Sequence, residues 1–274
     1  MDFAFNQEQN MFKKEVLKFA KKEIAPRCME HDQREEFDLE AFKKLGKFGL
    51  LGLHLPEEYG GAKADVVTAV LAGEALGEAG VDGGLTLSLG AHTYLCADTI
   101  FRHGSEEHKK RIIPALASGE WIGCMGLTEP DAGSDVASMT TTAEKKGDKY
   151  VLNGSKIFIT NGPIADVAVV YAKTDPEHAH AGISAFIVEK GTPGFSAGAP
   201  LKKMGCRTSQ TSELYFHNCE VPEENLLGNE GEGFLMAMET VEWDRSALLS
   251  PMIGGMTYAL RKSADYANNR IQFG

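Results

Sequence analysis

A cluster of small, oxygen-bearing residues interrupts an apolar run near the middle of this 274-residue chain. The segment reads IGCMGLTEPDAGSDVAS from Ile122 to Ser138, and its apolar part ends at Leu127. Segments of this composition usually form plain turns, because glycine, proline and aspartate each favour a turn conformation. They also occur where the main chain approaches a bound ligand too closely to tolerate large side chains. The composition alone leaves both interpretations open.

Other residues that could do chemistry stand in less informative surroundings. His178 and His180 lie in the polar segment DPEHAHAG, which predicts an exposed hairpin loop. His92, in SLGAHTYL, is interpreted either as a pocket-lining residue or as a core histidine. The glycine-rich run 228–233 lacks the strand–helix–strand context of a dinucleotide site, so a loop that leads into a helix is favoured there.

The totals exclude several classes of protein. A formal net charge of -11 argues against a nucleic-acid binder, which needs a basic surface to neutralise phosphates. The five cysteines are odd in number and contain no Cys-x-x-Cys pair, so we predict reduced thiols and no metal site. No apolar run reaches the about 18 residues of a membrane span, and the first residues lack the layout of a signal peptide. We therefore predict a soluble, cytoplasmic protein with no membrane span.

The elements that must position these residues begin with helices over residues 1–120. Apolar residues at spacings of three and four predict a first helix that Pro26 ends. Asp38 is a plausible cap for the next helix, and further helical runs cover 65–80 and 85–104. A short capped helix completes this part of the chain.

The periodicity then changes to two. KYVLNGSKIFITNG, VAVVYAKT, ISAFIVEK and SELYFHNCEV are rich in Val, Ile, Tyr and Phe, and turns separate them. They predict an antiparallel sheet or small barrel between Trp121 and Leu227. Helix returns from Phe234 to about Leu260 and then from Lys262 to Arg270.

This order of elements predicts a multidomain α+β fold. The predicted units are an N-terminal helical domain over 1–120, a central antiparallel β domain over 121–228, and the start of a C-terminal helical bundle over 229–274. Strands and helices do not alternate along the chain, so a Rossmann sheet is excluded.

Five segments together resemble the acyl-CoA dehydrogenase family. They are GLTEPDAGSD, KIFITNG, MGCRTSQTSEL, VEWDR and ADYANNRIQFG, and they follow the family's order across essentially the whole chain. The resemblance implies FAD bound between the β domain and the C-terminal bundle, in a homotetramer whose neighbouring subunits complete each flavin site. It implies oxidation of an acyl-CoA thioester to the 2,3-enoyl-CoA, with electrons passed to an electron-transferring flavoprotein.

The resemblance also implies which residues contact the flavin and the substrate. The Thr128 hydroxyl is expected to bond the ring near N5, while Gly133 and Ser134 approach the flavin phosphates and the acyl-CoA. Arg270 matches an arginine that reaches the flavin diphosphate of a neighbouring subunit, and a guanidinium suits a phosphate. The expected cofactor-binding residues are Met125, Leu127, Thr128, Gly133, Ser134, Phe158, Ile159, Thr160 and Arg270. Ser134, Glu242 and Arg245 are expected to bind the substrate.

The reaction of this family needs a carboxylate base within about 3 Å of the carbon alpha to the thioester. It also needs donors for the enolate-like oxygen, and a flavin that takes the hydride. Isovaleryl- and long-chain-like members carry the base on the first C-terminal helix, immediately before an arginine. Asp244, followed by Arg245, occupies that position here, although aspartate is one methylene shorter than glutamate. The alternative is an exposed residue that pairs with Arg245 or Lys262.

Three questions stay open at this stage. Aspartate bases occur, by resemblance, among alicyclic acyl-CoA dehydrogenases, so alicyclic and short branched acyl groups are both candidates. Relatives continue well beyond the position of Gly274, so we expect a C-terminally truncated chain that binds FAD poorly and has little activity alone. The other functional classes are a catalytically impaired or non-catalytic relative and a flavin oxidase of the same fold.

Overall fold

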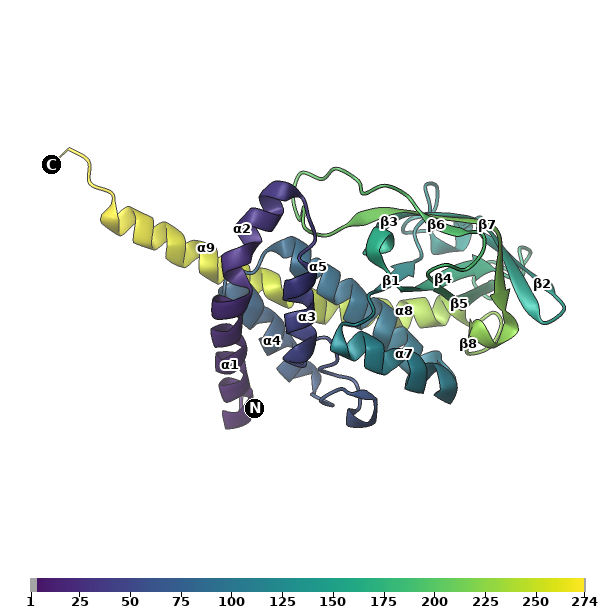
Figure 1. Cartoon of the computed structure of the whole chain (residues 1–274), viewed down its shortest axis with the longest axis horizontal. Helices are drawn as coiled ribbons and strands as arrows, with labels where there is room; N and C mark the ends of the chain where they lie inside the picture. Colours follow the sequence, from purple (N-terminus) through teal and green to yellow (C-terminus); the bar gives the residue numbers. More distant parts are fainter. Residues whose placement is uncertain (1–3, 274) are drawn as a thin grey trace.

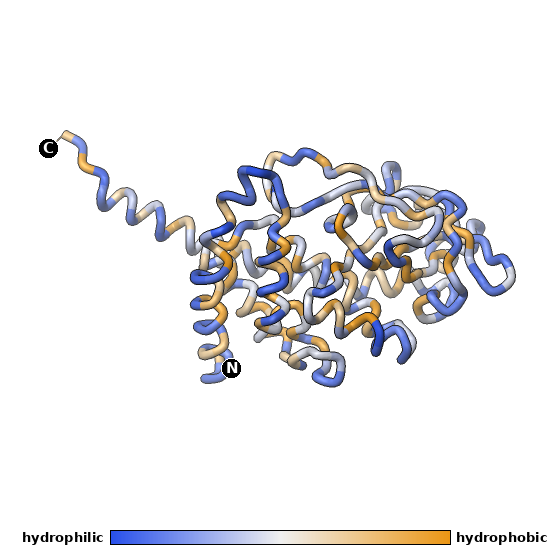
Figure 2. Tube along the Cα trace, viewed as in Figure 1, coloured by the Kyte–Doolittle hydropathy of each residue, from blue (hydrophilic) through white to orange (hydrophobic). Residues whose placement is uncertain are grey.

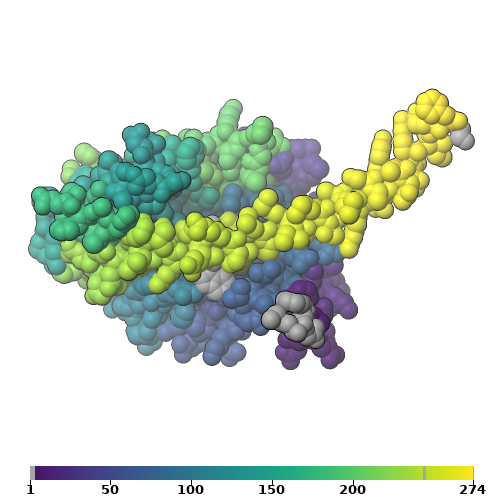
Figure 3. Space-filling view, turned by 180° about the vertical axis from the view of Figure 1, so that it is seen from behind, coloured from purple at the N-terminus to yellow at the C-terminus, as the bar shows by residue number. Residues whose placement is uncertain are grey.

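The computed structural model describes residues 4–273 and, within that range, all side chains except those of Trp243 and Asp244. Helices α1 to α7 form one part of the molecule and a sheet forms the other, as Figure 1 shows. The chain then returns through α8 (Gly233–Trp243) and α9 (Ser250–Asn269), which run along the back of both parts. Figure 3 shows this return lying on the surface and projecting beyond the body.

Five of the helices α1 to α7 begin at side-chain caps. Asn6, Asp38, Asp65, Asp82 and Ser105 each accept a hydrogen bond from a main-chain N–H in the first turn of the helix that follows. Such caps satisfy donors that otherwise have no partner at a helix N-terminus. The helices are α1 (Gln7–Glu23), α2 (Ala25–Arg34), α3 (Leu39–Lys47), α4 (Val66–Glu78), α5 (Gly83–Gly90), α6 (Asp98–His103) and α7 (Glu106–Ser118). The π-helical segment η2 (Ala91–Ala97) joins α5 to α6 without a break.

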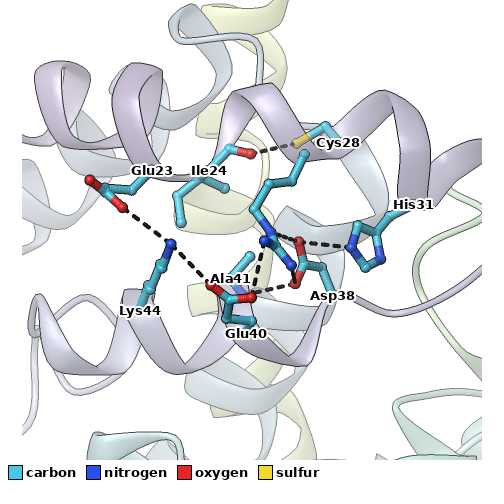
Figure 4. Close-up of polar contacts among 9 residues, drawn as sticks. Glu23, Ile24, Cys28, His31, Asp38, Glu40, Ala41 and Lys44 are labelled. Carbon is cyan, nitrogen blue, oxygen red and sulfur yellow. Dashed lines mark hydrogen bonds and ion pairs between the residues drawn. The ribbon is translucent and has the colours of Figure 1, made fainter.

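The Asp38 cap also holds the corner between α2 and α3. Figure 4 shows its carboxylate facing His31 of α2. It lies 3.2 Å from His31 Nε2 and 2.6 Å from Arg27 Nε of the same helix. Burial alone would raise the pKa of Asp38, but the Arg27 guanidinium and the Ala41 N–H lower it below its usual value. Lys44 of α3 meets Glu23 of α1 nearby. The predicted cap at Asp38 is therefore confirmed.

Two predicted helix boundaries are wrong. Pro26 does not end the first helix: α1 ends at Glu23, and Pro26 lies in the first turn of α2, where a missing N–H costs nothing. The break near residue 261 is also absent. The π-helical segment η6 (Asp244–Leu248) follows α8, and the chain bends at Leu249, with Pro251 in the first turn of α9.

Eight strands form a mostly antiparallel sheet in the described part of the chain. They are β1 (Gly123–Gly126), β2 (Thr142–Lys146), β3 (Lys149–Thr160), β4 (Val167–Lys173), β5 (Ile183–Glu189), β6 (Phe195–Ala197), β7 (Thr211–Pro222) and β8 (Leu226–Leu227). Their order is β6-β7-β3-β2-β4-β5-β8, with β1 beside β4. The prediction of an antiparallel sheet is confirmed, except that β1 and β2 each pair with β4 in parallel.

Alternation along β4 divides the core between the two faces of the sheet. Val167, Val169 and Tyr171 belong to a cluster shared with η2, α7 and α8, whereas Ala168 and Val170 belong to a cluster enclosed by β3 and β7. A third cluster lies among the N-terminal helices. Hydrophobic positions accordingly gather between the helices and the sheet, and hydrophilic ones on the outer turns (Figure 2). The helical layer and the sheet therefore meet at β1 and η2.

Candidate functional site

The small-residue segment emerges from β1 and runs from Leu127 to Thr141. β1 pairs with β4 from Gly123 to Gly126, which fixes the point at which the segment leaves the sheet. Glu129 and Ala132 then pair with each other through both main-chain hydrogen bonds. The segment is thus a fixed bend in the chain.

A buried ion pair lies beneath this bend. Lys156 of β3 is fully buried, and its Nζ lies 2.7 Å from Oε1 of Glu129. The same carboxylate accepts hydrogen bonds from the Thr140 N–H and hydroxyl and from the Thr141 N–H. Burial alone would raise the pKa of Glu129, but the Lys156 ammonium and these donors lower it to about 2. Burial lowers the pKa of Lys156 to about 8, against the opposing effect of Glu129.

Neither member of this pair is expected from the sequence. Lys156 stands in the strand pattern KIFIT, where a lysine usually marks an exposed position. Glu129 stands among turn residues that favour exposure. The available signals were the acidic residue directly after Thr128 and a lysine directly before the apolar run 157–159 of the strand.

Both peptide groups that flank Thr128 are held by β3. The Leu127 carbonyl accepts a hydrogen bond from Lys156 Nζ at 3.2 Å, and the Thr128 carbonyl accepts one from the Ile157 N–H at 2.9 Å. Among the described residues, the Thr128 N–H donates to no protein acceptor. The half-buried Thr128 therefore has a fixed main chain and an unused donor.

β3 carries a bulge beside this bend. Its register with β7 shifts between Lys156 and Ile159, and Phe158 in the bulge has a φ of 60°, which is rare for an aromatic residue. The Phe158 side chain is 65% exposed, while that of Ile159 is buried in the core. Phe158 is therefore available to a ligand. Because the Ile159 side chain is buried in the core, only its main chain could make the predicted flavin contact.

Asn161 fixes the end of β3. Its buried side chain donates through Nδ2 to the Ser88 carbonyl of α5 at 2.9 Å and to the Gly123 carbonyl of β1 at 3.1 Å. Its main-chain N–H donates to Gln210 at 2.7 Å, and its φ is 67°, in the region that asparagine tolerates better than most residues. Asn161 thereby locks the half-exposed Thr160 next to the helical layer.

Gly133 and Ser134 lie on the outer side of the bend, and both are exposed. No atom lies within 4 Å of where a Cβ of Gly133 would be, so nothing within this chain requires glycine there. The position is open to an approaching ligand, and both interpretations of the segment stay possible there.

The C-terminal candidates lie on the return of the chain. Glu242 at the end of α8 and Arg245 in η6 are exposed. The predicted base Asp244 begins η6, and its side chain lies outside the described residues. η6 and β1 both pack against η2, so the segment with Asp244 and the strand that leads into the bend share one neighbour.

An apolar hollow of about 370 Å³ opens beside η6. It is lined by Val81, Gly83, Thr86, Leu87, Cys206, Leu248, Leu249, Pro251, Met252 and Gly255. Thr86, Leu248 and Pro251 also line a smaller space among the N-terminal helices. The residues of the bend do not line either space.

Arg270 is not brought together with the bend. It follows the end of α9, and Figure 1 shows this end of the chain projecting away from the sheet. An arginine there cannot complete a site at Thr128 within the same chain.

The three histidines considered from the sequence do not lie in the bend. His92 is fully buried between the Leu116 carbonyl and the Gly123 N–H, so it is a core histidine. His178 and His180 lie in an exposed loop, as predicted. Within the described range, no three His, Cys, Asp or Glu side chains are arranged to hold a metal ion. None of the helices described has the length and apolar character of a membrane span.

The sequence of the chain matches a known protein family. The family description "Acyl-CoA dehydrogenase, N-terminal domain" matches residues 6–120, and "Acyl-CoA dehydrogenase, middle domain" matches residues 124–219. An acyl-CoA dehydrogenase of Bacillus subtilis (strain 168) is 48% identical over 268 residues, which are 98% of this chain and 70% of that protein.

Solved structures give the same result. Butyryl-CoA dehydrogenase from Megasphaera elsdenii has a TM-score of 0.94 at 41% identity, over 100% of this chain and 72% of the other. The FAD complex of PigA has a TM-score of 0.95 at 35% identity, over 100% and 72%. These matches confirm the resemblance and the fold class that the sequence predicted. The chain belongs to the acyl-CoA dehydrogenase family.

Proposed function

We propose that this protein is an FAD-dependent oxidoreductase that converts an acyl-CoA thioester to the 2,3-enoyl-CoA. The observation that carries the proposal is the bend after β1. It presents an open glycine at Gly133 and, at Thr128, a hydroxyl and an unused main-chain donor. The Thr128 carbonyl is bonded to Ile157, the residue before the exposed Phe158. Family membership and the FAD bound by the structural relative PigA support the cofactor.

The residues of the bend fit a flavin. Its main chain is held by β3 at Leu127, and no atom lies within 4 Å of where a Cβ of Gly133 would be, so a planar ring can approach the bend there. We assign the cofactor to Met125, Leu127, Thr128, Gly133, Ser134, Phe158, Ile159 and Thr160, with Ile159 acting through its main chain. When bound, FAD supplies the hydride acceptor.

The substrate groups are assigned to the bend and to the start of the C-terminal helices. Asp244 is the base that removes the alpha proton, because a carboxylate one residue before Arg245 is the family's alternative position for it. Ser134, Glu242 and Arg245 contact the acyl-CoA. The apolar lining of the hollow beside Leu248 supports an acyl chain there.

The assembly and the partner complete the proposal. Electrons leave to an electron-transferring flavoprotein, and the working form is a homotetramer in which Arg270 reaches the flavin diphosphate of a neighbouring subunit. The apolar side chains that α9 exposes support an oligomer, because such surfaces usually mark interfaces. They are Met252, Ile253, Met256, Leu260 and Tyr266.

Two further predictions from the sequence stay predictions. They are the domain limits, 1–120, 121–228 and 229–274, and the cytoplasmic location.

The test of the base compares two neighbouring acidic residues. With FAD and an artificial electron acceptor, Asp244→Asn is expected to lower kcat by about a thousandfold, since general bases typically contribute 10²–10⁴-fold. Glu242→Gln, two residues away, is expected to change mainly KM. Enoyl-CoA formation over a panel of short, branched and alicyclic thioesters measures both. An Asp244→Asn variant with the same kcat as the unchanged chain would remove Asp244 from the proposal.

A further inference from the structure

The ion pair between Lys156 and Glu129 lies behind the bend that the proposed function assigns to the flavin. Neither residue can touch a ligand with its charged group, because both are buried. Apart from each other, they bond to the bend itself. Lys156 donates to the Leu127 carbonyl, and Glu129 accepts from the main-chain N–H groups of Thr140 and Thr141. The pair therefore acts on the shape of the bend.

The contacts of Lys156 are concentrated on both ends of the bend. Its Nζ reaches Glu129 at 2.7 Å, the Leu127 carbonyl at 3.2 Å and the Met139 sulfur at 3.9 Å. Its stem has room because Gly126 lacks a side chain: a Cβ there would lie 3.3 Å from Lys156 Cγ. Leu214 of β7, its partner across the sheet, is apolar. Among the described residues, Glu129 is therefore the one charged group that faces the ammonium.

A buried ion pair of this kind adds little to the free energy of unfolding. Taking two charges out of water costs about as much as their attraction returns, and apolar replacements are often tolerated. A buried pair does impose one arrangement on the groups that satisfy it. Here those groups are the main chain at Leu127, Thr140 and Thr141, which begin and end the bend.

The consequence falls on Thr128. The Leu127 carbonyl and the Thr128 N–H belong to one peptide group, so a cationic donor on that oxygen polarises the unused N–H on the other side. The Ile157 N–H fixes the following peptide group. We propose that Lys156 is a positioning residue, paired with Glu129, that holds and polarises the Thr128 peptide as a hydrogen-bond donor to the flavin. This inference rests on the proposed function.

The test removes both charges together. Lys156→Met with Glu129→Gln keeps the approximate volumes and leaves no unpaired buried charge, whereas either single change would leave one. The matched control is Lys145→Met with Glu223→Gln, which removes a pair of equal chemistry at 2.6 Å on the surface of the same sheet. Both double variants are compared with the unchanged chain.

The first readout needs no flavin. Hydrogen exchange is expected to be at least tenfold faster in the double variant at residues 126–141 and at the Ile157 amide. Residues 211–222 of β7 serve as the internal reference. Unchanged exchange at the bend would overturn the proposal, and this result is independent of cofactor binding.

The second readout is the flavin itself. FAD is expected to bind about tenfold more weakly to the buried-pair variant. The affinity for reduced flavin should fall about tenfold more than the affinity for oxidised flavin, because a weaker donor stabilises the electron-rich reduced ring less. For a two-electron couple, this difference lowers the midpoint potential of the bound flavin by about 30 mV. The Lys145 control should match the unchanged chain.

The two readouts separate the possible failures. Faster exchange with unchanged FAD affinity and potential would mean that the pair is merely structural, and would overturn the proposal. If the unchanged chain binds no FAD, the proposed function fails. In that case the claimed role toward flavin falls with it, whatever the exchange measurement shows of the bend.

Discussion

At the scale of single residues, His92 joins the helical layer to the sheet. Nδ1 accepts the Gly123 N–H at 3.0 Å, so the proton of the neutral ring is on Nε2, which donates to the Leu116 carbonyl at 3.0 Å. A second proton on Nδ1 would remove the bond to β1. Burial lowers the pKa of His92 to about 4, against the opposing effect of the Leu116 carbonyl.

This pKa predicts sensitivity to acid. Between pH about 6.5 and pH 4 the unfolded chain binds a proton at this residue and the folded chain does not. Stability from His92 is therefore complete above pH 6.5 and is lost as the pH falls toward 4. We expect its share of the free energy of unfolding to fall by about 2 kcal/mol from pH 7 to pH 5.

Urea unfolding at the two pH values measures this share. His92→Gln should lose that part of the pH dependence, while His178→Gln, in the exposed loop, should keep it. An NMR titration gives a direct check that needs no variant. Proton uptake by His92 with a pKa near 6.5 would contradict the assignment.

At the scale of elements, α9 packs against α4 through glycines. A Cβ at Gly254 would overlap the Glu74 carbonyl oxygen, and one at Gly77 would overlap that of Pro251. The two main chains therefore approach each other without side chains between them. Gly255, the next residue of α9, has no atom within 4 Å of its Cβ direction. The contact holds the return of the chain, and η6 with it, against the helical layer.

Two neighbouring substitutions test this contact. Gly254→Ala is expected to destabilise the fold by about 1–3 kcal/mol, because overpacking forces main chain apart. Gly255→Ala should stabilise it by about 0.5–1 kcal/mol, because alanine favours the helix at an open position. Denaturant unfolding of the two variants provides the comparison. Equal effects at both positions would contradict the close approach.

At the scale of the whole molecule, local signals in the sequence predicted most of the arrangement. The period of two located β3, β4, β5 and β7, and Asp38 marked a helix start. The short strands β1 and β2, which flank the bend, were not predicted. The small residues from Thr128 to Ser134 marked the bend, because turn chemistry is local. The bend's open outer face and the fold class agree with those expectations.

The rest depends on contacts between distant parts of the chain. Lys156 and Glu129 are 27 residues apart, and neither residue type signals burial before the fold brings them together. Pro26 was interpreted as a helix end, although proline suits the start of a helix as well. The bend at Leu249, with Pro251 in the first turn of α9, was not predicted. The parallel pairing of β1 and β2 with β4 is likewise decided by packing against η2 and the sheet.

The central claim is that the bend after β1 serves a flavin that oxidises acyl-CoA. The most direct test is the visible spectrum of the chain loaded with a saturating excess of FAD, with free FAD subtracted, under anaerobic conditions, before and after a thioester is added. The account predicts that the bound flavin bleaches with at least one short, branched or alicyclic acyl-CoA and with no free acid. A bound flavin that keeps its oxidised spectrum with every thioester would contradict it.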